Sequence, residues 1–300
     1  MRVVITGGAG FLGSRLAQAL LARGTLTDAS GQAHTVDRVV LADVAAPASN
    51  ADPRVQAMQG SLDDPAFVER VVSPETDTVF HLAAVVSGQA EAEFDVGMRV
   101  NLDATRALLE RCRKCTKPPK FVFASSLAVF GGALPDPVPD DAPVTPQSSY
   151  GAQKAIGELL VNDMSRRRFM TDDEVGDHRA RRLQPQARRG RDRADCLDAR
   201  QRLADDAARK RRRRPIRLAG PHDDRRQPQR AAVDEALAAH VVDEQLADRV
   251  QWQYDPVIDR MVATWPARFE ARIGRALGMR ADAGFQDVVR AYIEQDMPPL

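Results

Sequence analysis

The first thirteen residues carry the pattern that most constrains the fold. A largely β-branched run, 2–6, leads into glycines at Gly7, Gly10 and Gly13, and an apolar helical pattern begins directly behind them. Gly7 lets the chain turn sharply, Gly10 lets a ligand approach the backbone, and Gly13 lets the helix lie close to the strand. The N–H groups at the start of that helix favour an anion. The stretch predicts a strand, a tight turn and a helix that hold a pyrophosphate, although an ordinary strand-to-helix connection would look similar.

Strand-like and helical patterns alternate through the first 165 residues. This alternation is typical of a parallel, right-handed, doubly wound sheet. We therefore predict an α/β fold of the Rossmann type, with a small and incomplete C-terminal substrate region. Gly24 is expected to end the first helix, and 25–37 to be a long polar connection. The predicted strands are 2–6, 39–43, 55–59, 78–84 and 120–126, and the other predicted helices begin at Asp64-Pro65, cover about 95–115, and cover 150–163.

The charge is divided unevenly along the chain, although its net value is only +1. Residues 166–230 contain 21 Arg and one Lys against 11 acidic residues, a local charge of +11. The same segment has only eight Val, Ile, Leu, Met or Phe residues, with no period of 2 or 3.6 that would bury one face. Because little apolar surface and much like charge disfavour compaction, we predict that this segment is irregular or disordered.

Three domains follow from these patterns. Residues 1–165 form the dinucleotide-binding domain with the catalytic helix, 166–230 the Arg-rich segment, and 231–300 a small α-rich remnant on the substrate side. Within this last part the patterns are a weak helix at 232–242, a strand at 249–252 and an apolar helical stripe at 285–292.

Composition excludes several classes of protein. No apolar run approaches the roughly 20 residues of a membrane span, and no cleavable signal precedes the first strand. A cytoplasmic enzyme with no membrane partner is therefore expected. Three cysteines give no disulfide framework. Cys112 and Cys115 form a C-x-x-C pair, but no second pair completes a zinc site, so we predict no metal.

Three side chains form the candidate catalytic set. Tyr150 and Lys154 lie four residues apart, which places a phenol and an ammonium on one face of one helix. A neighbouring ammonium lowers the pKa of a phenol, whose phenolate then takes a proton from a substrate hydroxyl. Ser126 ends the fifth predicted strand, where open α/β sheets place reacting groups, and can hold the substrate oxygen. Singly, such residues are usually surface contacts or turn residues, but together behind a dinucleotide turn they predict a catalytic site.

An acid, Asp43, ends the second predicted strand. A carboxylate there binds the ribose hydroxyls of adenosine and repels a 2′-phosphate, so NAD is favoured over NADP; the alternative is a solvated acid. Lys154 has a second predicted role at the ribose of the nicotinamide. Asn101 is either polar surface or a tie for the loop after the fourth strand. His81 is predicted to be a packed strand residue rather than a base.

Taken together, these residues resemble the extended short-chain dehydrogenase/reductase family, which includes NAD-dependent epimerases and dehydratases. The resemblance covers 1–165 and implies that Tyr150 is the base, Ser126 positions the substrate, and Lys154 serves both Tyr150 and the cofactor. The stretches that carry it are 6–13, 81–84, Asn101, 123–126 with 129–131, and Tyr150 with Lys154. The predicted cofactor contacts are Gly7, Gly10, Phe11, Leu12, Gly13, Asp43, Ser61, Leu62, Ala83, Asn101, Tyr150 and Lys154.

One turn departs from the family pattern. Members of the family usually have Asp where this chain has Ser61, beside the adenine. The backbone of Leu62 is then expected to make the adenine contact. A sixth strand and the Arg-Pro-Gly segment that the family places after the catalytic helix are not recognisable either.

Within the family, several stretches resemble the D-erythronate dehydrogenases: the insert at 24–38, the tripeptide 148–150, and the C-terminal stretches 265–266, 276–278 and 291–293. That resemblance implies NAD-dependent oxidation of a four-carbon sugar acid at C2 to the 2-oxo acid, and a homodimer is a further possibility. Two alternatives stay open. One is a nucleotide-sugar epimerase or dehydratase of the same family, and the other is a catalytically silent protein that binds a cofactor or nucleic acid.

The Arg-rich segment has two interpretations. Its composition over 168–230 resembles a GC-rich gene translated out of frame, and on this interpretation, which we favour, the activity of the chain is impaired. The alternative is a basic arm, in which the run 208–215 attracts nucleic acid through phosphate contacts. Phe169 is the one aromatic residue of 166–230 able to stack on a base, so a nucleic acid partner is not expected.

Overall fold

A computed structural model describes most of the first 170 residues and short stretches beyond them. The described residues fall into two compact units, and the second contains 130–143, which the sequence analysis had placed in the first domain. The first unit contains the described residues of 1–129 and 144–170. The described residues are 1–28, 31–47, 50–170, 216–219, 250–253, 265–266, 268–276, 278–279 and 287.

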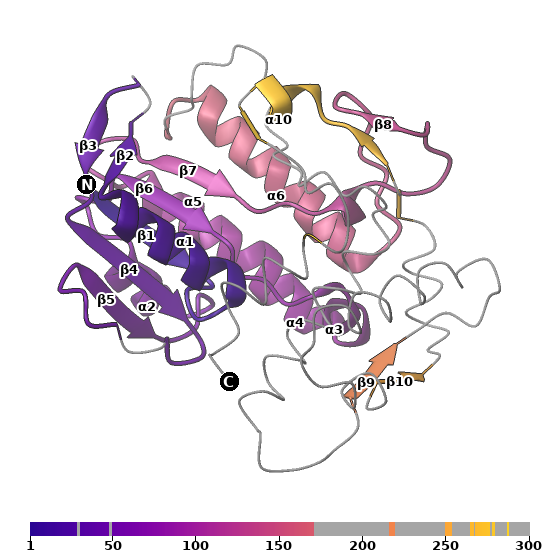
Figure 1. Ribbon diagram of the computed structural model, residues 1–300, viewed down its shortest axis with the longest axis horizontal. Helices are drawn as coiled ribbons and strands as arrows, with labels where there is room; N and C mark the ends of the chain where they lie inside the picture. Colours follow the sequence, from indigo (N-terminus) through magenta and orange to yellow (C-terminus); the bar gives the residue numbers. More distant parts are fainter. Residues whose placement is uncertain are drawn as a thin grey trace. The chain divides into compact units, whose positions relative to one another are not determined.

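The first unit is built on a five-stranded parallel sheet in the order β5-β4-β1-β6-β7 (Figure 1). The strand order reverses between β1 and β6, which is the switch point where open α/β sheets bind ligands. The predicted doubly wound parallel sheet is confirmed, but β6 and β7 end three residues before the predicted ends, because the chain leaves the sheet at His81 and Phe123. The strands are β1 (Arg2–Thr6), β4 (Arg38–Asp43), β5 (Val55–Gln59), β6 (Thr78–His81) and β7 (Lys120–Phe123).

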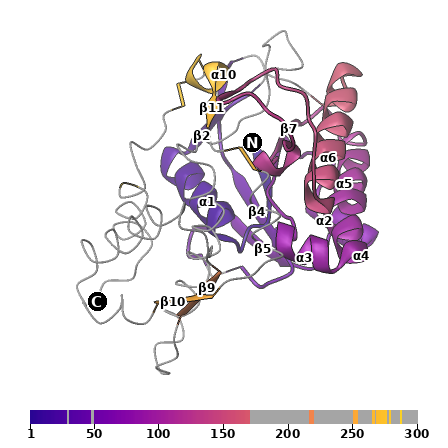
Figure 2. The ribbon, with the colours of Figure 1, turned by 90° about the vertical axis from the view of Figure 1, so that its right-hand side faces the viewer.

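Helices cover both faces of this sheet. Side chains alternate between faces along a strand, so Val3 and Ile5 pack with helix α1 while Val4 packs with α2, α5 and α6. Figure 2 shows α1 on one side of the sheet and the other three helices on the opposite side. The helical elements are α1 (Phe11–Arg23), α2 (Pro65–Val71), α3 (Ser87–Ala92), α4 (Phe94–Gly97), η1 (Met98–Asp103), α5 (Ala104–Cys112), η2 (Leu127–Val129) and α6 (Ser149–Arg166).

Local signals in the sequence set where these helices begin and end. Gly24 ends α1 in the left-handed conformation, with φ of 70°, and its N–H donates to Leu20. The Asp64 side chain caps α2 by accepting from the N–H of Ala66, and Ser148 caps α6 in the same way. The predicted end of α1 and start of α2 are confirmed.

The connection predicted at 25–37 contains a small antiparallel hairpin. Strands β2 (Thr25–Thr27) and β3 (Ala33–Thr35) pair with each other and not with the main sheet. Val36 follows directly and is fully buried in the core on the α1 side of the sheet. Leu26 of β2 also packs against this core, so two apolar residues anchor the hairpin, which composition alone did not reveal.

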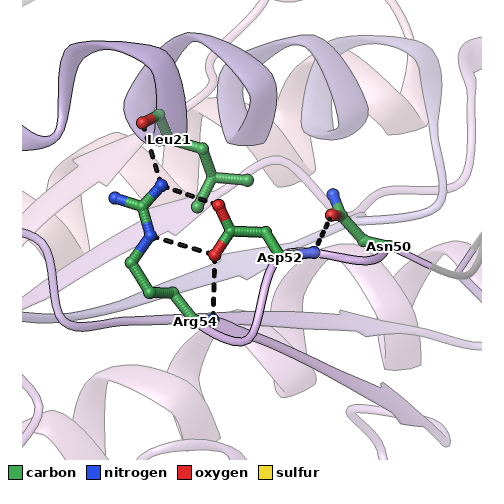
Figure 3. A network of polar contacts seen from close by, with 4 residues as sticks. All are labelled: Leu21, Asn50, Asp52 and Arg54. Atoms are coloured by element: carbon green, nitrogen blue, oxygen red, sulfur yellow. Dashed lines mark hydrogen bonds and ion pairs between the residues drawn. The ribbon is translucent and has the colours of Figure 1, made fainter.

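A polar network holds the start of β5 to the end of α1 (Figure 3). The Arg54 guanidinium donates to both carboxylate oxygens of Asp52, at 3.0 and 2.7 Å, and to the carbonyl of Leu21 at 3.1 Å. Asn50 accepts from the N–H of Asp52 at 2.9 Å. The ion pair lowers the pKa of Asp52 to about 2, mainly through the side-chain hydrogen bond from Arg54.

The second unit joins the proline-rich loop to C-terminal residues. Strand β8 (Val138–Pro139) pairs in parallel with β11 (Phe269–Glu270). Asp136 accepts two hydrogen bonds of 2.8 Å from Arg268. The Asp140 carboxylate accepts from two backbone N–H groups in the first turn of α10 (Arg272–Ala276).

Two further strands lie in the weakly patterned part of the sequence. Strand β9 (Ile216–Ala219) pairs in parallel with β10 (Val250–Gln253), which confirms the strand predicted near 249–252. No strand was predicted at β9. The rest of 171–230, the helix predicted at 232–242 and all of 285–292 except Asp287 lie outside the described residues. The irregular character and out-of-frame origin of the segment therefore stay predictions.

Candidate functional site

The three glycines of the first turn are required for different reasons. Gly7 adopts a φ of +73°, and a Cβ on Gly13 would lie 2.2 Å from the carbonyl oxygen of Gly7. The fold itself therefore requires both. A Cβ on Gly10 would meet only that same oxygen, at 3.2 Å. Gly10 is also the N-cap of α1, with no side chain bonded to it and no acid in the first turn, so this turn fits an approaching anion.

Asp43 lies beside the glycine turn, at the carboxyl end of β4. One carboxylate oxygen accepts from the N–H of Ala9 at 3.0 Å, and the other accepts from Ala45 at 3.1 Å. Each oxygen of a carboxylate has about two acceptor positions, so each keeps capacity for a hydroxyl. The geometry fits a pair of ribose hydroxyls at this point.

The remaining predicted cofactor contacts gather at the same edge of the sheet. The N–H of Gly60 donates to the Asp43 carbonyl at 2.9 Å, which sets the turn with Ser61 and Leu62 beside that acid. The Leu62 side chain is buried in the core, so its backbone is the part left for a ligand. Ala83 packs directly on Gly7. Phe11 and Leu12 form the first turn of α1, and Leu12 is 56% exposed.

A chain of buried hydrogen bonds runs from Ala83 to Asn101. The Thr105 hydroxyl donates to the Asn101 carbonyl at 2.7 Å, so it must accept from Nε2–H of His81 at 2.8 Å. Nδ1 of His81 then accepts from the Thr6 hydroxyl at 2.6 Å, and Thr6 accepts from the N–H of Ala83 at 3.3 Å. Burial, reinforced by the charge of Lys154, lowers the pKa of His81 to about 3. His81 is therefore neutral and structural, as the sequence predicted.

Asn101 acts through protein groups. It lies in η1, a π-helical stretch, and is buried. Its amide oxygen accepts from Val85, and its amide nitrogen donates to the Val85 carbonyl at 3.2 Å and to Gln153 at 2.8 Å. Both amide hydrogens are therefore used. Asn101 is therefore not a polar surface residue: it holds the loop after β6 in place. The predicted direct contact between this amide and a cofactor is not supported.

The three candidate catalytic residues come together around the loop after β7. Ser126 lies three residues beyond the strand, and its Oγ accepts from the N–H of Ala128 at 3.2 Å. Its hydroxyl also acts on Tyr150, in the first turn of α6, by lowering the pKa of that phenol. The Lys154 ammonium, one turn further, donates to the Ala124 carbonyl at 3.0 Å and lies 5.8 Å from the centre of the Tyr150 ring.

The charges in this group follow from burial. Burial raises the pKa of Tyr150, and the hydrogen bond from Ser126 opposes that rise. Lys154 is 2% exposed, and burial lowers its pKa to about 8. The sequence analysis expected the Lys154 ammonium to lower the pKa of the phenol. In the structure the Ser126 hydrogen bond is the interaction with that effect.

Three residues on α6 that no motif singled out also shape the site. A Cβ on Gly151 would lie 2.1 Å from the Ala128 carbonyl oxygen, and one on Gly157 would lie 2.7 Å from the Phe123 ring. Both glycines let α6 pack directly on β7 and its loop. Gln153 is 1% exposed and bonds Asn101. Because residues six apart do not share one face of a helix, the spacing of these glycines gave no sequence signal for this packing.

The residues at the carboxyl edge fit a dinucleotide. The helix start at Gly10 is open to an anion, Asp43 has acceptors for ribose hydroxyls, and Ser126, Tyr150 and Lys154 belong to the same sheet unit. Within the described part of the chain, no group of three His, Cys, Asp or Glu residues is placed to hold a metal. None of the described helices is long and apolar enough to cross a membrane.

Comparison with known proteins also indicates a dinucleotide-binding protein, and the similarity extends over nearly the whole chain. Residues 3–170 match the NAD dependent epimerase/dehydratase family. The chain is 44% identical to a D-erythronate dehydrogenase of Cupriavidus necator, over 98% of both chains. A D-erythronate dehydrogenase of Haemophilus influenzae is 34% identical over 99% of this chain and all of the relative. A solved nucleoside-diphosphate-sugar epimerase from Agrobacterium tumefaciens has 30% identity and a TM-score of 0.69, covering 99% of this chain and 94% of its own.

These matches confirm the predicted family, the predicted Rossmann fold, the NAD cofactor and an NAD-dependent dehydrogenase. The structure supplies the reason that NAD fits, because the glycine turn, Asp43 and the loop after β6 line one edge of the sheet. The chain belongs to the NAD dependent epimerase/dehydratase family.

Proposed function

We propose that this chain oxidises the C2 hydroxyl of a four-carbon sugar acid, D-erythronate or a close analogue, to the 2-oxo acid. The observation that carries the proposal is the grouping of three side chains at the loop after β7: Lys154 bonds the Ala124 carbonyl and lies 5.8 Å from the centre of the Tyr150 ring, and Ser126 acts on the Tyr150 phenol. The two relatives named D-erythronate dehydrogenase, matched over nearly the full chain, support the choice of substrate.

Tyr150 is the proposed base. Because Ser126 acts on the Tyr150 phenol, a substrate oxygen placed between the two hydroxyls would be held by both. The Tyr150 phenolate takes the proton of the substrate hydroxyl. The C2–H bond breaks, its electron pair leaves as hydride, which NAD accepts when bound, and a carbonyl forms at C2. Donation from Ser126 favours this step, because it stabilises the charge on the phenolate.

Lys154 has two proposed tasks. Its pKa of about 8 leaves the ammonium mostly protonated at neutral pH, so it remains a donor. One hydrogen bond, to the Ala124 carbonyl, holds α6 to the loop that carries Ser126. An ammonium has two further N–H donors, and we assign one of them to the ribose next to the nicotinamide.

The test is a substrate panel with the purified chain and NAD. D-erythronate, its C2 epimer D-threonate and a UDP-sugar are offered separately, and NADH is followed by absorbance. We expect NADH from D-erythronate alone, at the reduced rate that the out-of-frame interpretation of 168–230 predicts. NADH from D-threonate alone would move the proposal to the other configuration at C2, and no NADH from any sugar acid would end it.

The second candidate is a nucleotide-sugar epimerase or dehydratase. The observation that favours it is the Agrobacterium tumefaciens epimerase, which is similar to this chain over nearly its whole length. Such a reaction regenerates its NAD and gives no net NADH. Conversion of the UDP-sugar without NADH, followed by chromatography of the products, would select this candidate.

Cofactor choice is a separate part of the proposal. A 2′-phosphate would meet the Asp43 carboxylate, a like-charge contact that costs on the order of several kcal/mol in a partly dry site. We expect NAD to bind much more tightly than NADP. Asp43→Asn keeps an acceptor for Ala9 and should narrow the difference, measured by titration of both cofactors. Equal binding of NADP by the unmodified chain would contradict the assignment.

Oligomeric state and location are two further points to test. Sedimentation of the purified chain measures its mass and shows whether it forms a homodimer. A cytoplasmic location is expected for an enzyme of small-molecule metabolism, and fractionation of the source cells tests it.

A further inference from the structure

The loop that carries Ser126 is fastened to helix α6 at successive positions. The Phe123 ring fills the space beside Gly157, and the Ala124 carbonyl accepts from Lys154. Further along, the Ala128 carbonyl packs where a side chain at position 151 would otherwise lie. Each contact joins the loop to a different turn of one helix, so the geometry between loop and helix is tightly set.

Ser125 adds a side-chain link to this series. Its hydroxyl donates to a carboxylate oxygen of Glu158 at 2.5 Å. The neighbouring Ser126 uses its hydroxyl differently, with Ala128 and Tyr150 as partners. Two adjacent serines thus face two parts of α6, one toward a carboxylate and the other toward the phenol. A hydrogen bond to an ionised carboxylate is among the stronger kinds.

Glu158 does not serve as the counter-ion of Lys154. The two residues are four apart on α6 and therefore lie on one side of it. Burial alone accounts for the lowered pKa of Lys154, and the ammonium donates to a carbonyl rather than to this carboxylate. Oε1 of Glu158 instead accepts a hydrogen bond from the Ser125 hydroxyl.

We propose that Ser125 and Glu158 are a positioning pair that holds Ser126 at Tyr150, a role that rests on the proposed oxidation at a hydroxyl carbon. Neither residue touches the reacting atoms. The pair fixes the residue before Ser126 to the helix that carries Tyr150, two turns beyond the Tyr150 contact. Without it the loop can move away from α6, and the hydrogen bond that stabilises the Tyr150 phenolate weakens.

Four variants separate this role from a general effect on folding. Ser125→Ala removes the donor, Glu158→Leu removes the acceptor, the double variant removes both, and Glu158→Gln keeps an oxygen that can accept. Glu69→Leu, at an exposed carboxylate on α2, is the matched control. Kinetics of sugar acid oxidation and NAD titration are measured for each.

We expect Ser125→Ala to lower kcat about tenfold, the scale of one hydrogen bond to a charged group, and to leave the Kd for NAD unchanged. The double variant should be no slower than the slower single variant, because the two residues act as one unit. Glu158→Gln and Glu69→Leu should stay within about twofold of the parent chain.

A second readout does not depend on any substrate. The chain has three tyrosines, so the ionisation of Tyr150 can be followed by ultraviolet absorbance as the difference from Tyr150→Phe. We expect Ser125→Ala to titrate Tyr150 at higher pH than the parent chain does, because Ser126 no longer stabilises the phenolate as well. Should the parent chain oxidise no sugar acid, the proposed function fails, while this titration still judges the positioning pair.

Either of two results would overturn the pair. The first is an unchanged Tyr150 titration in Ser125→Ala, together with a kcat within twofold where turnover can be measured. The second is a loss in Glu158→Gln as large as that in Glu158→Leu, which would show that the charge of Glu158 matters and its hydrogen bond with Ser125 does not. Because Ser125→Ala deletes a single oxygen, it also decides the case if Glu158→Leu fails to fold.

Discussion

The two halves of the site are held in different ways. The glycine turn after β1 is held by backbone groups, such as the N–H of Gly8 on the Ala42 carbonyl and the N–H of Gly10 on Gly7. The loop after β7 is held by side chains that reach it from a helix about 30 residues later, among them Lys154. In the half built from backbone, a substitution that adds a side chain should destabilise the fold. In the half built from side chains, a substitution should lower activity while the fold persists. Four substitutions test this difference.

The largest effect is expected from Tyr150→Phe. The ring still packs, but the proton acceptor is gone, and general-base catalysis is commonly worth a factor of about 10² to 10⁴. We expect kcat to fall by that factor while NAD binds with nearly unchanged Kd, as measured by steady-state kinetics and titration. A variant that retains most of its turnover would show that Tyr150 is not the base and that the catalytic half lies elsewhere.

Gly13→Ala tests the half built from backbone. Its Cβ would overlap the Gly7 carbonyl oxygen at 2.2 Å, and backbone cannot move aside as a flexible side chain can. Overpacking usually costs about 1–3 kcal/mol, and this contact belongs at the upper end of that range or beyond it. Thermal unfolding and NAD titration should both show the damage.

Gly10→Ala is the matched control, because its Cβ meets that oxygen at 3.2 Å. We expect near-normal stability and weaker NAD binding, since the added methyl group occupies the space beside the helix start. Equal losses of stability in the two variants would mean that the turn does not divide into structural and ligand-facing glycines.

His81 makes the link between the halves sensitive to acid. Its pKa is about 3 in the folded chain and 6.5 ordinarily, so below pH 6.5 the unfolded chain binds a proton that the folded chain does not. Stability from this residue is complete above pH 6.5 and is lost as the pH falls toward 3. The loss is about 1.4 kcal/mol per pH unit, or about 2 kcal/mol between pH 6.5 and 5.

Denaturant unfolding at several pH values measures this slope. His81→Gln should reduce it, whereas His34→Gln, at a partly exposed histidine beside Asp28, should leave it in place. An unchanged slope in His81→Gln would assign the acid sensitivity to the carboxylates of the chain.

The smallest effect is expected at Arg54, which is far from both halves along the chain. Arg54→Met removes the hydrogen bonds that the guanidinium donates to the Asp52 carboxylate and to the Leu21 carbonyl. Ion pairs at the surface contribute little, and this one is only partly buried, so Tm should fall by no more than about a few degrees. The pKa of Asp52 should rise from about 2 toward its ordinary 3.8, measured by NMR. A large loss of Tm would mean that this network holds β5 in the sheet.

Much of the fold could be predicted because its signals are local. The turn at Gly7, the end of α1 at Gly24 and the start of α2 at Asp64 each depend on residues within a few positions of one another. The hairpin at 25–37 could not be predicted in this way, because it is anchored by the burial of Val36, and burial depends on what α1 and the sheet present to it. Strand β9 was missed because its four residues lie in a stretch of the sequence that is rich in charged residues, where no apolar pattern is visible.

The candidate site divides along the same line. Sequence motifs identified Ser126, Tyr150 and Lys154. They did not show that the Asn101 side chain donates both of its amide hydrogens to protein groups. The assignment of the shift in the Tyr150 pKa to Ser126 also needed the structure, because burial and hydrogen bonds depend on the packing of the loop after β7 on α6.

By itself, the sequence determined the nucleotide-binding turn, the order of strands and helices, and the identity of the residues available for chemistry. These follow from backbone preferences and hydrophobic periodicity, which act over a few residues. Only the tertiary structure decided that the neighbouring hydroxyl of Ser125 faces Glu158, while Ser126, which the sequence had named, acts on Tyr150. Neighbouring residues with the same side chain have the same local preferences, so their different roles arise only when a distant helix offers each a different partner.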